Sequence, residues 1–283
     1  MSVVIAQDQL QRKVEDLSNL PTLPGVVQAV CTMVEDQHTS AQDIGEIISR
    51  DQVLSAKLLR VVNSPVYGFP GRISSVTHAI VLLGFNVVKG LILSSAVFDG
   101  LASGMQGLWE HSLGVALVSR RMAKELKHSD AEEVMVAGLL HDLGKVVTSY
   151  LEPEAYRQAT TIAEARHVHI AKAEAEVFGI DHTRVSSWLA WRWHLPERLG
   201  DALTYHHRPE RAKQGRETTA IVHVADILAR GMGYGSGGDP SMPPLHQETF
   251  QSLGLSFEQI DAVLADAEQQ YAAGADIFKP GGN

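Results

Sequence analysis

The sequence predicts an all-α protein in which a helical N-terminal subdomain (residues 1–105) packs on a C-terminal helical bundle (residues 106–283). Hydrophobic residues recur at helical spacing along most of the chain, whereas the alternation typical of strands is hard to find. Apolar residues make up 45% of the 283 positions, which is enough to bury a core and excludes intrinsic disorder for most of the chain. A break of small residues at 100–107 marks the expected boundary between the two parts.

Helix signals follow one another in the N-terminal part. A short helix is expected to start at Ser40, whose side chain can cap it, with Asp43 in the first turn. The next helix must end before Pro65, because the residue before a proline leaves the α region. The expected elements are a turn-rich segment at 16–24, helices at 26–34, 40–49 and 51–63, a loop at 66–72, a helix capped by Ser74 or Ser75, and two short buried helices within 79–98 that meet near Gly84.

The apolar run at 79–98 has about the length of a membrane span, roughly 20 residues. It contains the charged Lys89 and the helix breakers Gly84 and Gly90, and a charge at mid-span would cost roughly 2.5–3.5 kcal/mol. We therefore expect no membrane-spanning helix and no membrane partner. The first ten residues show no basic segment followed by an apolar core, so we expect no signal peptide and a cytoplasmic location.

The C-terminal part contains a clear helix start. Ser129-Asp130-Ala131-Glu132 has the pattern of a capping box, with Ser129 as the cap and Glu132 three residues later. We expect it to open one helix that continues to about Tyr150. The other expected helices lie at about 108–127, 154–167, 170–178, 183–193, 196–207, 218–230 and 256–273, and a glycine- and proline-rich stretch at 231–244 predicts a mobile loop.

Charge and cysteine content exclude several classes of function. The chain carries 24 Lys and Arg against 33 Asp and Glu, a formal charge of −9, which argues against nucleic acid as the main partner. Cys31 is the single cysteine, so an intramolecular disulfide and a cysteine-based zinc finger are excluded. Thirteen histidines are present. A metal in this protein would therefore need imidazole and carboxylate ligands.

An adjacent His141-Asp142 pair lies inside the helix expected at 131–150 and can offer two ligands to one metal. Lys145 follows His141 by four residues and Asp142 by three, which places its ammonium on the same helix face. An ammonium beside a metal suits an anionic substrate such as phosphate. Gly138 would let a neighbouring helix approach closely. The alternative is a partly exposed histidine with an acidic neighbour.

Other histidines and one aspartate strengthen the metal interpretation. Asp226 lies in the apolar stretch 220–228 and needs a partner, because an unpaired buried charge is expensive. That partner is a metal or a salt bridge with Arg230 or His223. His167 and His169 are two residues apart and would diverge on a helix, so we leave them out of the candidate set. The candidates that accompany the pair are His111, His182, His206, His207 and Asp226.

The order His, His-Asp, His, His-His and Asp along successive helices resembles the ligand set of the HD superfamily. It is also similar to that of the HD-GYP phosphodiesterases, including the His-Asp-x-Gly-Lys motif. The resemblance implies an HD-like bundle in which Asp142 bridges two metal positions, and imidazole and carboxylate ligands suit iron, manganese or zinc. One metal would be held by His111, His141, Asp142 and Asp226, and the second by Asp142, His182, His206 and His207.

Four spaced motifs in the N-terminal part resemble the HD-related output domain (HDOD) family. They are Leu20-Pro21-Thr22-Leu23-Pro24, Ile48-Ser49-Arg50-Asp51-Gln52-Val53-Leu54, Leu59-Arg60-Val61-Val62-Asn63-Ser64-Pro65 and Ile73-Ser74-Ser75-Val76-Thr77-His78-Ala79-Ile80, and the resemblance covers roughly residues 15–235. Its members are bacterial all-α proteins of signalling and regulation, many of which have lost the metal ligands. This chain keeps all seven. It departs from HD-GYP, because Arg208-Pro209-Glu210-Arg211 follows His207 with no Gly-Tyr-Pro motif.

The resemblance implies two hypotheses for the function. The first is a cytoplasmic regulatory module of signal transduction that holds one or two divalent ions, with iron preferred over manganese and zinc. Its partner would be a signalling protein or a small anionic ligand, either phosphate or a nucleotide. The alternative is a metal-dependent phosphohydrolase or phosphodiesterase acting on a nucleotide or a cyclic dinucleotide, with Asp142 and Lys145 as catalytic residues and Lys145 binding phosphate.

Overall fold

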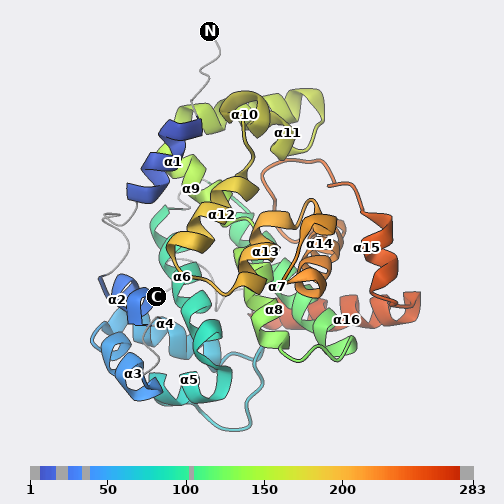
Figure 1. The fold of residues 1–283 in the computed structure, drawn as a ribbon. Coiled ribbons are helices and arrows are strands. Elements are labelled where there is room, and N and C mark those ends of the chain that lie inside the picture. The colour runs from blue at the N-terminus through green and yellow to red at the C-terminus, as the bar shows by residue number, and fades with distance from the viewer. Residues whose placement is uncertain (1–6, 17–24, 34–38, 102–104, 275–283) are drawn as a thin grey trace.

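The computed structural model describes residues 7–16, 25–33, 39–101 and 105–274, and within these ranges the protein is all-α, as predicted (Figure 1). No strand occurs in the described ranges. Most of the turn-rich segment at 16–24, part of the break at 100–107 and the first HDOD motif at 20–24 lie outside them. The N-terminal part comprises α1 (Gln7–Glu15), α2 (Gly25–Met33), α3 (Ala41–Ser49), α4 (Gln52–Val62), α5 (Val76–Leu83) and α6 (Phe85–Leu101).

Local capping confirms several predicted helix ends in this part. Ser40 accepts a hydrogen bond from the backbone N–H of Asp43, whose carboxylate accepts one from Ser40 in return. Ser75 rather than Ser74 caps α5. Gly84 ends α5 with a positive φ of 80°, so that α6 can start in a new direction. The helix at 7–15 was not expected from the sequence.

In the C-terminal part, α7 lies at the centre of a bundle and packs against α8, α14 and α16 (Figure 1). Its residues are buried on nearly every side, which explains its weak amphipathic pattern. The elements are α7 (Leu108–Glu125), α8 (Ala131–Leu140), α9 (Leu143–Leu151), α10 (Pro153–Arg166), α11 (Ile170–Phe178), α12 (His182–Arg192), α13 (Glu197–Tyr205), η2 (Pro209–Arg211), α14 (Arg216–Gly231), α15 (Gln247–Ser252) and α16 (Phe257–Gly274).

The helix expected at 131–150 is two helices, and the prediction of one continuous helix is wrong. Asp130 rather than Ser129 caps α8, because its carboxylate accepts from the backbone N–H of Glu133. Helix α8 ends at Leu140 and α9 begins at Leu143. The His141-Asp142 pair therefore occupies a junction between helices rather than a helix interior, where its side chains can reach groups on several elements.

Glycines let the helices around this junction approach closely. A Cβ on Gly138 would lie 2.8 Å from the Ser119 hydroxyl oxygen and 3.0 Å from backbone atoms of α7, in agreement with the sequence prediction. A Cβ on Gly144 would lie only 2.0 Å from the carbonyl oxygen of His182. The Gly144 N–H also donates to the Ser186 hydroxyl over 3.0 Å. The start of α9 is therefore in backbone contact with the start of α12.

Gly144→Ala is expected to push α9 and α12 apart, because the clash is with backbone and no side chain can rotate away. Overpacking of this kind costs about 1–3 kcal/mol or more in the free energy of unfolding. Urea unfolding monitored by circular dichroism measures the change. Gly179→Ala has no neighbour within 4 Å of its added Cβ and tests only the cost of a positive φ. A Gly144→Ala protein as stable as the wild type would show that the close approach is not required.

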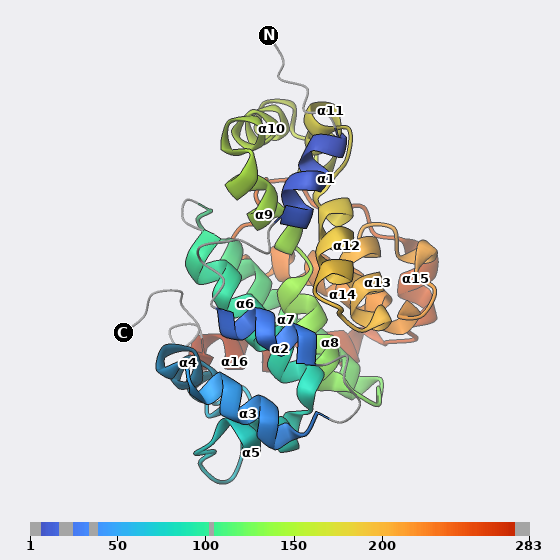
Figure 2. The ribbon, with the colours of Figure 1, turned by 60° about the vertical axis from the view of Figure 1, so that its left-hand side comes forward.

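The two predicted subdomains are joined by specific polar contacts. The buried Arg120 of α7 donates to the carbonyl oxygen of Val66 and to Glu132, and its guanidinium lies 5.3 Å from the centre of the Tyr67 ring. Helix α1 packs on α12 and α9, within the C-terminal part (Figure 2). The division at residue 105 stays a prediction. Helix α1 precedes that boundary in the sequence but packs against helices that follow it.

The segment at 231–244, which the sequence predicts to be a mobile loop, is hydrogen-bonded to several parts of the bundle. The Gly237 carbonyl oxygen accepts a hydrogen bond from the Lys145 ammonium over 2.7 Å. The Ser241 carbonyl oxygen accepts from Arg230 over 3.1 Å, and the Ser236 N–H donates to the carbonyl oxygen of Gly107. In the part of the chain that the structure describes, no helix has both the length and the apolar character needed to cross a membrane.

Candidate metal centre

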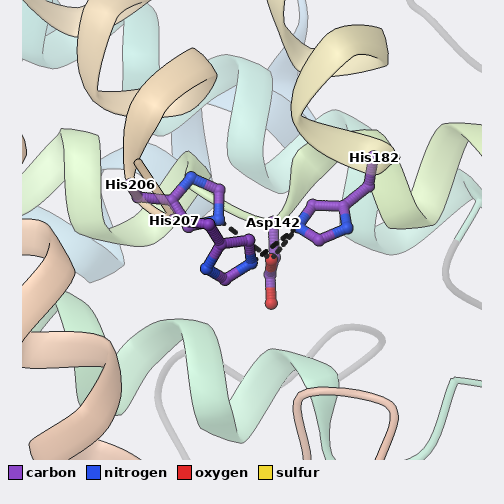
Figure 3. Close-up of side chains that lie close together, drawn as sticks. All are labelled: Asp142, His182, His206 and His207. Carbon is purple, nitrogen blue, oxygen red and sulfur yellow. Dashed lines mark hydrogen bonds and ion pairs between the residues drawn. The ribbon is translucent and has the colours of Figure 1, made fainter. Parts of the chain in front are cut away.

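The structure brings the seven predicted ligand residues together at the centre of the C-terminal bundle, and Figure 3 shows four of them. Six of the seven residues are at most 1% exposed, whereas His207 is part-buried. Five different elements or junctions supply them. His111 comes from the first turn of α7, His141 and Asp142 from the α8–α9 junction, His182 from the start of α12, His206 and His207 from the end of α13, and Asp226 from α14.

The ligand atoms form two groups with Asp142 between them. The first group is His111, His141 and Asp226, and the second is Asp142, His182, His206 and His207. Within each group one ligand atom of every residue lies within 4.8 Å of the others. This division corresponds to the two metal positions that the family resemblance implies. Metal coordination by these residues stays a prediction.

The carboxylate of Asp142 directs one oxygen toward each group. Its Oδ2 lies 3.2 Å from Nε2 of His141 and 3.7 Å from Nε2 of His111. Its Oδ1 lies 3.3 Å from Nε2 of His182 and 3.8 Å from Nε2 of His206 (Figure 3). Asp142 therefore lies between the two groups, whereas the bridging of two metals that the family resemblance implies stays a prediction.

Hydrogen bonds to the opposite ring nitrogen orient three of the imidazoles. The Nδ1 of His141 lies 2.8 Å from the carbonyl oxygen of Gly138, and that of His206 lies 3.2 Å from the carbonyl oxygen of Leu203. The Nδ1 of His182 lies 2.6 Å from the Glu174 carboxylate. Because a carbonyl oxygen only accepts, Nδ1 of His141 and of His206 carries a proton, and Nε2 is the nitrogen of each ring that faces Asp142 and could bind a metal.

The chemistry of this donor set fits a transition metal. Among the described residues, Nε2 of His141, Nε2 of His206 and Oδ1 of Asp142 have no hydrogen-bond partner in bonding geometry. The Nε2 atoms of His182 and His207 lie 3.2 Å apart. Buried lone pairs that converge in this way need a cation or a shared proton between them. Imidazole nitrogen and carboxylate oxygen suit divalent iron, manganese or zinc.

Charged neighbours keep both buried carboxylates ionised. Burial alone would raise the pKa of Asp142, but His141 and the Lys145 ammonium outweigh it and hold the pKa well below its usual range. For Asp226, burial is likewise outweighed by the Arg230 guanidinium and by His111, and the pKa is well below its usual range. Both carboxylates are therefore available as anionic ligands.

Burial has the opposite effect on most of the imidazoles. It lowers the pKa of His206 and of His207 well below the ordinary value for histidine, so both rings are neutral and can coordinate a metal. At His182, burial also lowers the pKa, but the Glu174 carboxylate outweighs it and the pKa rises to about 9. A metal at this position would therefore displace a proton from His182.

Lys145 lies beside the centre, where two protein acceptors bind its ammonium. Its side chain is completely buried, and its ammonium donates to Oδ2 of Asp142 and to the carbonyl oxygen of Gly237, each over 2.7 Å. The helix spacing therefore predicted its nearness to Asp142 correctly. The phosphate-binding and catalytic roles of Lys145, and the catalytic role of Asp142, stay predictions.

The sequence analysis offered a salt bridge with Arg230 or His223 as an alternative partner for Asp226, and the bridge with Arg230 is present. The Arg230 side chain donates to Oδ1 of Asp226 over 3.0 Å, and Nε2 of His111 lies 3.1 Å from the same oxygen. His223 does not pair with Asp226. It lies instead with Nδ1 2.7 Å from the carbonyl oxygen of His206, where it supports the backbone of a ligand residue.

Two residues of the site were missed in the sequence. Glu174 lies on the same helix face as Ile170 and Val177, and a carboxylate on such an apolar face was the signal that could have identified it. His169 was set aside as diverging on a helix, but it is the N-cap of α11. Its ring centre lies 4.6 Å from that of His207, although it belongs to neither ligand group.

Glu174→Gln is expected to lower metal affinity by about 10–100-fold, the usual effect of changing an outer-shell partner of a histidine ligand. Glutamine keeps an acceptor for His182 but removes the negative charge that raises the ligand's basicity. Competition with a chromophoric chelator measures the affinity. Glu176→Gln is the matched control, because Glu176 lies on the same helix and its side chain is 52% exposed. Equal affinities for the two variants would contradict a role for Glu174.

Comparison with known proteins identifies the family. The family model of the HDOD domain matches residues 20–209. An uncharacterised protein of Treponema pallidum (strain Nichols) is 25% identical over 223 residues, which cover 76% of this chain. The chain spans only 43% of the length of that relative.

Two solved structures show the same fold. An HDOD domain protein of unknown function from Geobacter sulfurreducens matches with a TM-score of 0.72 and 27% identity, over 96% of this chain and 97% of the other. A protein from Marinobacter aquaeolei VT8, whose name proposes a role in signal transduction, matches with a TM-score of 0.69 and 20% identity. That match covers 90% of this chain and 59% of the other.

Proposed function

We propose a regulatory function in signal transduction for this chain, which belongs to the HDOD family. In this proposal the His/Asp centre binds one or two divalent transition-metal ions, with iron as the first candidate. The metal links five elements of the bundle, and a protein partner receives the output. The name of the Marinobacter aquaeolei protein supports a signalling role, since the two chains share the fold.

The burial of the centre is the observation that favours regulation over catalysis. Six of its seven residues are at most 1% exposed. The nearest ammonium, that of Lys145, already donates to Asp142 and Gly237. A substrate phosphate would have to break this buried ion pair before it could bind Lys145, and a buried pair is costly to separate.

A metal-dependent phosphohydrolase or phosphodiesterase is the second candidate, and the position of Asp142 favours it. One carboxylate between two groups of ligands is the arrangement found in dinuclear hydrolases, where bound metal supplies an activated water for attack on phosphorus. The residues of this chain would hold the metals and keep the carboxylates ionised. A cyclic dinucleotide or a nucleotide would be the substrate.

Hydrolysis assays with a binding control distinguish these two functions. The protein is loaded with iron or manganese and incubated with cyclic dinucleotides, nucleotides and a generic phosphodiester. Regulation predicts no turnover above that of the His141→Ala, Asp142→Ala double variant. It also predicts a difference in affinity capture from an extract of the source organism. The immobilised wild type should bind a partner protein that the immobilised double variant does not bind. Turnover that is lost in Asp142→Ala would overturn the regulatory function and support the hydrolase.

A further inference from the structure

Trp191 lies on the surface of α12 and is 73% exposed to solvent. The other three tryptophans, Trp109, Trp188 and Trp193, are each at most 8% exposed. Helix α1 packs on α12 but leaves Trp191 uncovered (Figure 2). An exposed tryptophan keeps a large apolar surface in water, and tryptophan is among the residues that dominate the binding energy of protein interfaces. Trp191 therefore marks a surface suited to a protein partner.

Trp191 belongs to a stripe of side chains along one face of α12. Arg184, Trp188 and Trp191 follow one another at intervals of four and three residues, which is the spacing of one helix face. The exposed Arg184 has its guanidinium 5.5 Å from the centre of the Trp188 ring. These three residues are called the α12 stripe. It presents a cation and an apolar ring about 10 Å apart along the helix axis.

Basic residues predominate around the α12 stripe, although the chain as a whole has a net charge of −9. Helix α12 contains no acidic residue. Between residues 182 and 216, six basic residues are exposed, against two acidic ones. The half-buried Asp201 accepts hydrogen bonds from the three backbone N–H groups at 213–215, which compensate its charge within the protein. This part of the surface therefore attracts anionic groups.

Arg208 adds a second cation beside the start of the stripe. Its guanidinium donates to Oδ2 of Asp181 over 3.2 Å and to Oγ1 of Thr183 over 3.3 Å. Thr183 directly precedes Arg184 in the chain. The Arg208 side chain is 43% exposed, so it remains accessible to a partner while these two contacts hold it in place.

We propose that the α12 stripe is the docking site for an acidic segment of a partner protein. Trp191 packs against an apolar side chain of that segment, and Arg184 and Arg208 pair with its carboxylates. Tryptophan and arginine are the residues most enriched at the centres of interfaces, and opposite charge steers the encounter. The net charge of −9 disfavours a nucleic acid at the same place. This inference rests on the proposed function in one respect, because the docked protein would be the partner that receives the output.

The helices that form this surface also carry the second group of candidate metal ligands. His182 is the first residue of α12, two positions before Arg184. His207 directly precedes Arg208. A metal at this group would hold the start of α12 and the end of α13 in one fixed relation, and with them the two arginines. The state of the centre would therefore influence how well the surface fits its partner.

Fluorescence anisotropy with a labelled peptide of glutamate and leucine tests the docking site on the full chain as purified. A helical peptide of about 12 residues is about 18 Å long and spans the stripe. It should bind with a Kd of about 100 μM or tighter at low salt and more weakly at high salt. Trp191→Ala and Arg184→Glu should each weaken binding by about tenfold or more. Phe257→Ala and Arg157→Glu, at exposed positions of α16 and α10, are matched controls and should bind as the wild type does.

Four results would overturn the proposal. The peptide does not bind, or neither stripe variant weakens its binding. A peptide of lysine and leucine, or a single-stranded oligonucleotide, binds at least as tightly. Sedimentation shows a dimer that Trp191→Ala dissociates, in which case a second copy of the chain occupies the stripe.

The His141→Ala, Asp142→Ala double variant separates the docking site from the proposed function. Peptide binding as tight as that of the wild type would leave the docking site standing and refute its control by the metal centre. Metal content is measured on the same samples. Wild-type protein that holds metal but binds no peptide would refute the docking site and leave the metal centre standing.

Discussion

Asp142→Asn is expected to lower metal affinity by more than about 100-fold, a larger loss than changing an outer-shell partner causes. Each oxygen of Asp142 faces a different group of imidazoles, at 3.2 Å from His141 and 3.3 Å from His182. Asparagine keeps the shape of the side chain but replaces one anionic oxygen with an amide nitrogen, which cannot act as a ligand. Both metal positions should therefore be weakened by this single change.

The same substitution is expected to cost about 3–5 kcal/mol in the free energy of unfolding of metal-free protein, because it leaves the buried Lys145 ammonium without its anionic partner. Adding Lys145→Met removes the unpaired charge. The double variant should therefore recover much of the stability and none of the metal affinity. Asp261→Asn, at an exposed position of α16, is the control for the chemistry of the substitution. Full metal affinity in Asp142→Asn would refute the bridging role.

Removal of metal is expected to lower the melting temperature of the wild type by about 10 °C. A ligand present at a thousand times its Kd stabilises the folded state by about 4 kcal/mol, and each kcal/mol shifts the melting temperature by about 2–4 °C in a domain of this size. The physical reason is that the ligands come from five parts of the bundle, and in their absence the converging lone pairs have no cation between them.

Differential scanning calorimetry before and after dialysis against a chelator measures this shift. In the Asp142→Asn, Lys145→Met variant the shift should be at most about a third as large, because a 100-fold weaker site leaves the metal at no more than about ten times its Kd. Readdition of iron or manganese should restore the wild type. An unchanged melting temperature in the wild type would show that any bound metal contributes nothing to the fold.

Helix content and the candidate ligands could be predicted from the sequence because both depend on local patterns. Hydrophobic spacing and capping residues such as Ser40 predict helices directly. The histidines and aspartates could be selected by their order along the chain. The break at the His141-Asp142 pair was missed, because a capping pattern followed by apolar residues looks the same whether one helix or two follow.

Contacts between separate elements could not be predicted in this way. The pairing of Glu174 with His182 depends on how α11 turns back onto α12, and the contact of Lys145 with Gly237 joins residues 92 positions apart. His169 was misjudged because its position between two helices, as a cap, is not visible in the spacing of His167 and His169. Each of these contacts depends on tertiary packing, which the spacing of residues along the chain does not specify.

Metal analysis of untagged protein, combined with anomalous scattering from a crystal, tests the proposed centre most directly. The protein, purified from cells supplied with iron, manganese and zinc, should contain about one to two transition-metal ions per chain. The anomalous peaks should lie among His111, His141, Asp142 and His182, and they should be absent from crystals of the His141→Ala, Asp142→Ala variant. Metal-free protein from such cells, or full metal content in the double variant, would contradict the centre.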